Sequence, residues 1–311
     1  MKYLKPFLFI IVILVAVVFL TLPVYSALVS DFEYSTNGDG TITITKYSGE
    51  ATEVTVPNKI EDKQVTVIGS KAFDSNLHVK TITMPLGAVS IGFRAFACCE
   101  TLEEINLPET LTEINNQAFF LCKNLKSIKI PDNVTVIGYG AFSSCTNLKE
   151  VTLPTSLKEL KGYTFQYCKN LQFITMPESI TYIGDYAFSE CESLKTVELP
   201  STLENIGEFA FQYCTSLTAM NLPEGLKKIG YGSFMLCESL KELMIPSTVT
   251  SIRSFAFSNC SELLKVSVLS PDVKVEKDAF RKCGLAIIYA HDGSTGAAYA
   301  KTNKMPLVIL K

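Results

Sequence analysis

Several residue types and motifs that carry chemistry are scarce or missing in this 311-residue chain. Only two histidines occur, His78 and His291, and no Cys-x-x-Cys pair is present, so the sequence offers no clustered ligand set for a metal ion. The net charge of −3 leaves no basic footprint for nucleic acid. No motif of a nucleophile, a general base or a cofactor loop is present either. We therefore expect a protein that is not an enzyme and that needs no metal and no cofactor.

The chain begins with a segment typical of an export signal. Lys2 and Lys5 precede an unbroken apolar run over 7–20, and a small-residue site follows near Ser26. The run is slightly long for a signal peptide and slightly short for a membrane span, so a peptide cleaved after Ser26 and an uncleaved N-terminal anchor both stay open. In either case the rest of the chain is exported, as a secreted or cell-surface protein that touches the membrane only through residues 1–26.

The rest of the chain is dominated by a repeat of 23 residues. Cysteine follows three residues after each repeated phenylalanine from Cys99 to Cys283, and proline keeps the same period over most of this range. Such a fixed period is typical of solenoid folds. The repeated phenylalanines are Phe73, Phe96, Phe119, Phe142, Phe165, Phe188, Phe211, Phe234, Phe257 and Phe280.

Each unit predicts one turn of a stacked structure. In one unit the apolar Ile105 and Leu107 alternate with the polar Glu104 and Asn106, which indicates a short strand with one buried face. A proline ends the strand, and the chain then returns through further apolar positions to a short helical turn at an Ala-Phe pair. A single unit cannot bury its apolar side alone, so copies must stack with their strands in parallel. Ten such turns predict a solenoid on the order of 45 Å long.

The motif Ile-Gly-x-x-Ala-Phe-x-x-Cys, combined with Leu-x-x-Ile-x-Leu-Pro, resembles the BspA-like class of bacterial leucine-rich repeats. The resemblance covers about residues 65–283, and the segment 288–306 is similar to the closing segment of such proteins. It implies a repeat solenoid of leucine-rich-repeat type, in which each coil has a short parallel strand plus turns. It also implies a surface or secreted protein, since several members of the class are adhesins for host matrix proteins or partner cells. Leu160-Lys161 and Ile252-Arg253 replace Ile-Gly without breaking the motif.

We expect four parts in the chain. Residues 1–26 are the signal peptide or anchor, and residues 27–64 form an N-terminal β cap. In this cap Asn37-Gly38-Asp39-Gly40 turns a hairpin, and Ile60 to Gln64 makes a longer first coil. Residues 65–283 form the solenoid, and residues 284–311 form a C-terminal cap. The turn at Asn37 is faintly similar to a calcium loop but lacks the spaced acids and the closing glutamate.

The column of nine cysteines from Cys99 to Cys283 suggests either disulfides or free thiols. Stacked thiols would lie about one strand spacing apart, which disulfide geometry does not forbid. Side chains in register point the same way, however, and nine thiols cannot all pair, so we expect free buried thiols that pack as small apolar groups. Cys98 stands outside the column and is the cysteine expected to face the surface or to react.

The exposed side of the strands is the predicted binding surface, as is usual for solenoids. Its outward residues vary from unit to unit and mix both signs of charge, which argues against a polyanionic partner. Phe173 and Met244 are predicted to be exposed there, and exposed apolar side chains favour contact with a protein. The candidate binding residues are Glu104, Asn106, Lys129, Glu150, Thr152, Phe173, Thr175, Glu198, Asn221, Glu242 and Met244.

Aromatic residues beside the Ala-Phe turn form a second candidate surface. They recur at the 23-residue period, so they share two columns along the solenoid. Such rings could stack on sugars, or they could pack between successive turns, which is the simpler use. One column holds Tyr163, Tyr186, Phe209 and Phe255, and the other holds Tyr167 and Tyr213.

The sequence leaves three functional hypotheses. The leading one is adhesion to, or recognition of, an extracellular or host protein through the strand side, with a glycan as an alternative ligand. The second is a passive spacer or envelope scaffold. The third is an enzyme, for which the sequence nominates no residue. A binding protein should lose affinity when Phe173 and Met244 are changed, whereas a spacer should be indifferent to these changes.

Overall fold

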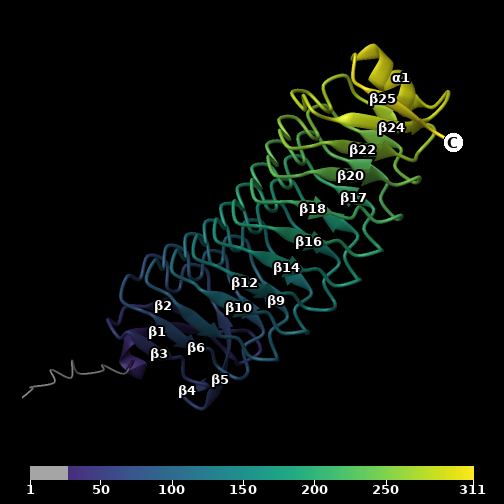
Figure 1. The fold of residues 1–311 in the computed structure, drawn as a ribbon. Helices are drawn as coiled ribbons and strands as arrows, with labels where there is room; N and C mark the ends of the chain where they lie inside the picture. Colours follow the sequence, from purple (N-terminus) through teal and green to yellow (C-terminus); the bar gives the residue numbers. More distant parts are fainter. Residues whose placement is uncertain (1–26) are drawn as a thin grey trace, which may run out of the picture.

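The computed structural model describes residues 27–311, which form a straight rod of stacked coils (Figure 1). The predicted export segment, residues 1–26, lies outside the described residues and stays a prediction. Each coil repeats after 23 residues, so the chain advances along the rod from one end to the other. The repeat solenoid predicted from the sequence is confirmed.

One long side of the rod is a row of short parallel strands. Ile82 lies opposite Ile105, one repeat further on, and the same register continues along the rod. The central residue of each short strand is buried and its neighbours point outward, as the alternation predicted. We call the outward side of this row the strand face. The row consists of β3 (Glu53–Thr55), β6 (Thr81–Thr83), β8 (Glu104–Asn106), β10 (Ser127–Lys129), β12 (Glu150–Thr152), β14 (Phe173–Thr175), β16 (Thr196–Glu198), β18 (Ala219–Met220), β20 (Glu242–Ile245), β22 (Lys265–Val268), β24 (Ile287–His291) and β25 (Leu307–Leu310).

A second row of strands, which the sequence pattern did not predict, covers another side of the rod. Each strand except the last buries the isoleucine, leucine or valine at the position before the frequent glycine of the repeat. A Cβ atom on Gly138 would lie 2.3 Å from the backbone nitrogen of Asn116 in the preceding coil, so only glycine fits this close approach. The strands are β5 (Lys63–Ile68), β7 (Ser90–Ile91), β9 (Glu113–Ile114), β11 (Val136–Ile137), β13 (Glu159–Leu160), β15 (Tyr182–Ile183), β17 (Asn205–Ile206), β19 (Lys228–Ile229), β21 (Ser251–Ile252) and β23 (Lys274–Val275).

The remaining side, which we call the turn side, is built from consecutive tight turns around each Ala-Phe pair. In one coil the backbone N–H groups of Arg94, Phe96 and Cys98 donate to carbonyls of the next coil at 2.7–3.1 Å. Two residues of each such turn, here Arg94 and Cys98, have φ near +55°, the left-handed region that L residues enter at a cost. The ladder of hydrogen bonds between coils offsets this cost, because the N–H groups at alternate positions of the turn each donate to a carbonyl of the next coil.

The core is organised by a ladder of the repeated phenylalanines. Every ring from Phe73 to Phe280 is buried, and the centroids of successive rings lie 5.0–5.5 Å apart. Most pairs are nearly parallel, because neighbouring coils have the same backbone geometry. The ladder continues into both caps, since Tyr47 stacks on Phe73 and Tyr299 meets Phe280 edge-on. Stacked aromatic rings therefore run through the interior from cap to cap.

The cysteines form a second internal column, and all ten are free thiols, as predicted. Each thiol from Cys99 to Cys283 donates a hydrogen bond of 2.9–3.3 Å to the carbonyl oxygen of the phenylalanine 26 residues earlier. This bond satisfies a backbone acceptor that would otherwise be partly unpaired in the core. Burial raises the pKa of the thiols from Cys99 to Cys237, reaching about 12 for Cys99 and Cys145.

Thiol labelling of the native protein tests this arrangement. The thiolate is the reactive form, so buried thiols with a raised pKa should resist a thiol reagent near pH 8. We expect one thiol per chain to react in the native state, that of the half-buried Cys98, and all ten to react after denaturation without reductant. A Cys98→Ser variant should abolish the native reaction. Fewer than ten thiols in the denatured protein would indicate disulfides and contradict the structure.

The N-terminal end is closed by a short 3-10 helix and two hairpins. The helix η1 (Val29–Asp31) leads into β1 (Phe32–Thr36), which pairs antiparallel with β2 (Ile42–Tyr47). The hairpin predicted at Asn37–Gly40 is therefore confirmed, and Asp39 uses its carboxylate to accept hydrogen bonds from Thr41 within the turn.

The prediction of a longer first coil at Ile60 to Gln64 is wrong. These residues form a second antiparallel hairpin, in which β4 (Lys59–Ile60) pairs with the start of β5. Glu61 and Asp62 make its two-residue turn, both with positive φ. This turn has no Asx-Gly pair, which is the usual sequence signal for such a turn. Two acidic residues adopt the left-handed conformation here instead.

The C-terminal cap ends the solenoid with a helix and an added strand. The helix α1 (Thr295–Thr302) begins after Ser294, whose side chain accepts a hydrogen bond from the N–H of Ala297. The hydroxyl of Tyr299 accepts from the N–H of Phe280 at 3.3 Å and donates to the carbonyl of Lys277 at 3.1 Å. The turn-side ladder has no further coil to bond here, so this hydroxyl takes its place. Strand β25 pairs with β24 and completes the strand row.

Candidate functional site

The strand face places all eleven predicted binding residues on one exposed surface. Each of these side chains points to solvent, including Phe173 at 50 % exposure and Met244 at 57 %. Ten of them lie within strands of the row, and Asn221 follows directly after β18. The predicted outward orientation is therefore confirmed, whereas a binding role for these residues stays a prediction.

Two interruptions divide the strand face into three parallel sheets. No strand pairing joins β8 to β10 or β18 to β20, although these strands are neighbours along the rod. A hollow of about 330 Å³ lies at the first interruption and is lined by Glu104, Asn106 and Lys129 among others. A second hollow, of about 390 Å³, lies at the next interruption and is lined by residues of β18, β20 and β22. Six of the eleven predicted residues line these hollows, and five lie on the continuous sheet between them.

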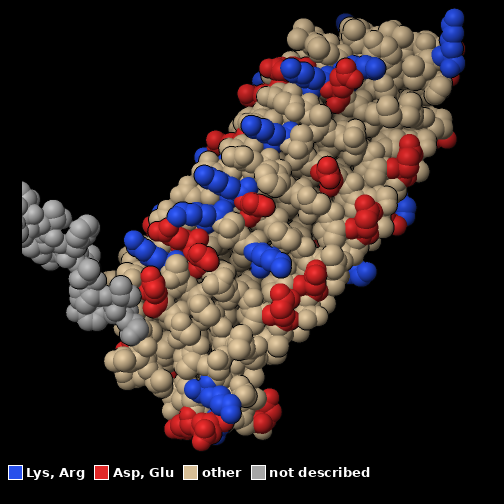
Figure 2. All heavy atoms as spheres, turned by 60° about the horizontal axis from the view of Figure 1, so that its bottom comes forward, with Lys and Arg blue, Asp and Glu red and all other residues tan. Residues whose placement is uncertain are grey.

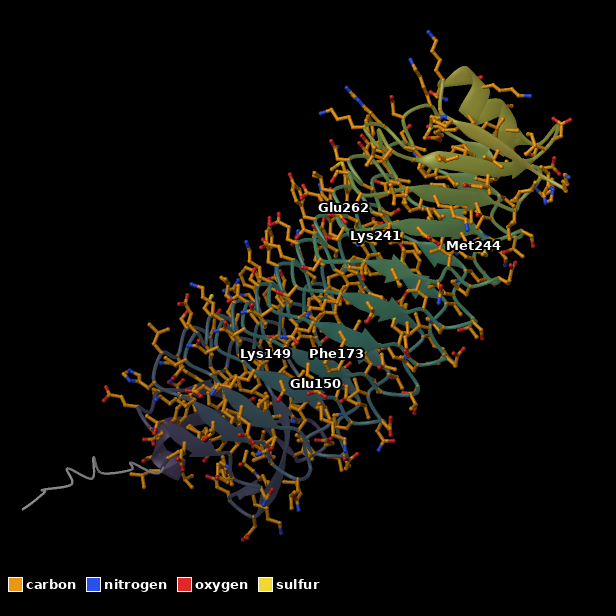
Figure 3. All side chains as sticks on the ribbon, viewed as in Figure 1. Lys149, Glu150, Phe173, Lys241, Met244 and Glu262 are labelled. Carbon is orange, nitrogen blue, oxygen red and sulfur yellow. The ribbon has the colours of Figure 1, made fainter. Side chains whose placement is uncertain are left out.

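The two exposed apolar side chains lie at different places on this face. Figure 3 shows Phe173 beside Lys149 and Glu150 in the middle of the rod, on neighbouring coils. Met244 lies nearer the C-terminal end, where it lines the second hollow with Glu242. The strand face thus offers two apolar contact points, each surrounded by charged or polar groups, which is the usual anatomy of a protein-binding patch.

Charged residues follow the long edge of the strand face in alternation. Figure 2 shows basic and acidic side chains interleaved along one long edge of the rod. Many of them pair between consecutive coils, as Lys123 does with Glu100 at 2.8 Å and Lys169 with Glu192 at 2.7 Å. These pairs are largely exposed, so salt screens them and they contribute little to stability. Their mixed signs give the face no strong field of one sign.

The aromatic column on the turn side packs between successive coils. Tyr163 stacks on Tyr186 with centroids 5.0 Å apart, and Tyr186 stacks on Phe209 at 4.8 Å. Phe255 joins the column through Tyr231, which meets both of its neighbours edge-on. Packing between successive coils is therefore confirmed for the first column, whereas Tyr167 and Tyr213 of the second column are exposed. All of the column residues at 163, 186, 209 and 255 have positive φ, which no sequence pattern indicated.

Residues 27–311 contain no arrangement that points to catalysis or metal binding. No group of three or more histidine, cysteine or acidic side chains lies close enough within this range to hold a metal ion. Nor does this part of the chain include a helix long and apolar enough to cross a membrane.

Two stacked rows of short parallel strands, a turn side and an internal aromatic ladder define the protein as a leucine-rich-repeat solenoid. The family model of the BspA type leucine rich repeat region matches residues 46–172 and 158–286, which is more than half of the chain. The chain belongs to this family. No curated protein matches it.

Solved structures of other bacterial leucine-rich-repeat proteins are similar. The leucine-rich-repeat protein of T. pallidum is 29 % identical, with 70 % of this chain and 91 % of that chain covered and a TM-score of 0.53. A leucine-rich cell surface protein of Faecalibacterium prausnitzii A2-165 is 24 % identical over 86 % of this chain and 95 % of its own, with a TM-score of 0.45. The pneumococcal vaccine antigen PcpA is 20 % identical over 91 % and 98 %, with a TM-score of 0.43.

Proposed function

We propose that this protein is an exported binding protein whose strand face recognises another extracellular protein. The carrying observation is the surface itself: an exposed face whose outward side chains differ from coil to coil, with Phe173 and Met244 exposed among polar neighbours. A spacer needs only the inward residues, which the repeat keeps nearly constant. Large exposed apolar side chains at two places on the same face favour contact with a partner.

Export is part of the same proposal. The basic residues Lys2 and Lys5, the apolar run over 7–20 and the small residues near Ser26 support secretion or surface anchoring. Membership of a family that includes bacterial surface proteins supports the same location. Free cysteines do not oppose it, because the column thiols are buried and bonded to backbone carbonyls.

The test is binding of residues 27–311, which include both caps, to immobilised extracellular-matrix proteins and glycans. For a saturable protein hit, we expect a Phe173→Ala, Met244→Ala double variant to bind at least about tenfold more weakly, as removal of two exposed anchors would give. The control is Leu86→Ala, which removes an apolar side chain that is 72 % exposed outside the strand face.

The outcomes separate the hypotheses. If the double variant and the Leu86→Ala control bind with equal affinity, the strand face is not the binding surface. No binding to any protein by a folded sample would favour the passive scaffold. Circular dichroism and thermal unfolding of each variant show that a lost signal is not a lost fold.

A further inference from the structure

A column of left-handed residues on the turn side has two gaps. From Arg94 to Phe255, eight successive coils have a residue with φ between +53° and +62° at this position. Six of these residues carry a polar, charged or aromatic side chain, and two are glycines. Gly140 and Gly232 are the two glycines, so at these coils the column lacks a side chain. The column runs through Arg94, Gln117, Gly140, Tyr163, Tyr186, Phe209, Gly232 and Phe255.

The gap at Gly232 is filled by neighbouring rings. A Cβ atom on Gly232 would lie 2.7 and 2.8 Å from two ring carbons of Phe209, which therefore occupies the space. Tyr231 packs edge-on against Phe209 and Phe255 and closes the column on either side. This glycine is explained by the packing of the protein with itself.

The gap at Gly140 is open. A Cβ atom there would meet only ordinary contacts, at 3.7 Å from Gln117 and Ser143 and 3.9 Å from Tyr163. A hollow of about 410 Å³ lies over this glycine and is lined by Phe93, Asn116, Gln117, Phe120, Tyr139, Gly140, Ser143, Tyr163 and Gln166. This volume falls in the range of small-molecule sites. We call it the Gly140 slot.

The slot has the dimensions of a single ring. Gln117 lies one coil before Gly140 and Tyr163 lies one coil after it. The backbones of Gln117 and Tyr163 are therefore two coils apart, or roughly 10 Å. Tyr186 covers one face of the Tyr163 ring, so its other face is directed toward the coil of Gly140. A ring inserted over Gly140 would continue the aromatic stack by one step, at the spacing that the column itself uses.

The polar groups of the slot are neutral and available. Within residues 27–311, the side chains of Gln117, Ser143 and Gln166 donate and accept no hydrogen bond. The carbonyl oxygen of the Asn116 amide accepts from the N–H of Tyr139 at 2.9 Å, which leaves its NH₂ group free to donate. Amides and hydroxyls both donate and accept, so they match hydroxyl groups of a ligand.

Two cations near the slot each lie over an aromatic ring that lines it. The Lys161 ammonium lies 5.7 Å from the centroid of Tyr139, and the Arg94 guanidinium lies 5.8 Å from that of Phe120. Arg94 also pairs with Asp74 at 3.1 Å. No acidic or basic side chain lines the slot, so it has no charged group with which to select an ionic ligand or a charged peptide.

We propose that the Gly140 slot binds one pyranose ring of a neutral glycan. The C–H face of the sugar would stack on Tyr163, since the face of an aromatic ring is electronegative and attracts polarised C–H groups. Its hydroxyls would bond to the amides of Gln117, Gln166 and Asn116. A lining of aromatic rings, amides and a hydroxyl, with no charged side chain, suits a polyol better than a peptide, which needs partners for its backbone amides or charges. This site goes beyond the proposed protein binding and lies outside the strand face.

The test compares sugar binding by the unchanged protein with sugar binding by four variants. Saturation-transfer NMR with glucose, galactose, mannose, N-acetylglucosamine and their β-linked disaccharides should show weak binding, in the millimolar range for a single ring. Gly140→Gln fills the slot and should weaken binding at least about tenfold while the fold survives, because Gln117 occupies the same column position at φ +56°. Tyr163→Ala should have a similar effect, and Tyr163→Phe should bind nearly as the parent does.

Tyr213→Ala is the matched control, because it removes an exposed tyrosine elsewhere on the turn side. It should leave sugar binding unchanged. Absence of binding to every sugar, wild-type affinity in Gly140→Gln, or tighter binding of a tyrosine-containing dipeptide than of any sugar would overturn the proposal. None of these outcomes bears on the strand face, whose test uses Phe173 and Met244.

Discussion

Raising the pH from 8 to 10 is expected to lower the free energy of unfolding by at least about 2 kcal/mol. The seven thiols from Cys99 to Cys237 have a raised pKa in the folded state because they are buried. In the unfolded chain they ionise from about pH 9 upward. Their contribution to stability is therefore complete below pH 9 and is lost as the pH rises toward the folded pKa values, which are about 12 for Cys99 and Cys145.

The size of this effect follows from the number of thiols acting together. One unit of pH between the two pKa values costs about 1.4 kcal/mol for each thiol, so Cys99 and Cys145 together lose about 3 kcal/mol at pH 10. The other five buried thiols add to this loss in the same direction. Each thiol also donates a hydrogen bond to a phenylalanine carbonyl, which a thiolate cannot do. The folded state therefore resists ionisation until it unfolds.

Urea unfolding at pH 7, 8, 9 and 10, in the presence of a phosphine reductant, measures this dependence. A Cys145→Ala, Cys168→Ala double variant is the control, since it removes two of the seven groups. Its loss between pH 8 and pH 10 should be smaller than that of the parent by at least about 1 kcal/mol. A stability that is the same at pH 8 and pH 10, or a double variant with the parent's slope, would contradict the burial of these thiols.

Two phenylalanines of successive coils should lose very different amounts of stability on truncation. Phe165 is fully buried, with rings 5.5 Å away on either side, so Phe165→Ala opens a cavity and should cost about 3–5 kcal/mol. Phe173 lies eight residues later in the sequence and is 50 % exposed, so Phe173→Ala should change stability by less than about 0.5 kcal/mol. Denaturant unfolding of the two variants checks both values.

The shape of the transition should change as well. Each coil contacts mainly its neighbours, so stability is nearly a sum of interfaces between adjacent coils. A gap at Phe165 weakens two adjacent interfaces near the middle of the ladder and should broaden the transition or split it into two steps. Equal stabilities of the Phe165→Ala and Phe173→Ala variants would show that the aromatic ladder does not carry the core.

The sequence predicted the solenoid because its period specifies packing. Phenylalanine and cysteine recur every 23 residues, and only stacked coils give each of them the same surroundings, which are those found. The outward residues of the strand face could be placed because alternation in a strand is local. Phe173 and Met244 were expected to be exposed for this reason.

Other features depend on contacts between coils and left no sequence signal. The second strand row consists mostly of two-residue strands, too short for an alternating pattern. The hairpin at Glu61-Asp62 and the left-handed Tyr163 break the usual preference of such positions for glycine or asparagine. The hollows arise where β8 and β18 fail to pair with the next strand. The Gly140 slot depends on a side chain that is missing from a three-dimensional column.

Because the coils stack at a regular spacing, the number of repeats sets the distance between any two places along the rod. Five coils separate the two hollows of the strand face, so a partner touching both would span about 24 Å. Insertion or deletion of one whole repeat between them would change that span by about 4.8 Å and leave the residues of each hollow intact. The distance between the two hollows can thus change while the residues that line each hollow stay the same. Duplication of one repeat would fit the rod to a longer partner, and loss of one repeat would fit it to a shorter one.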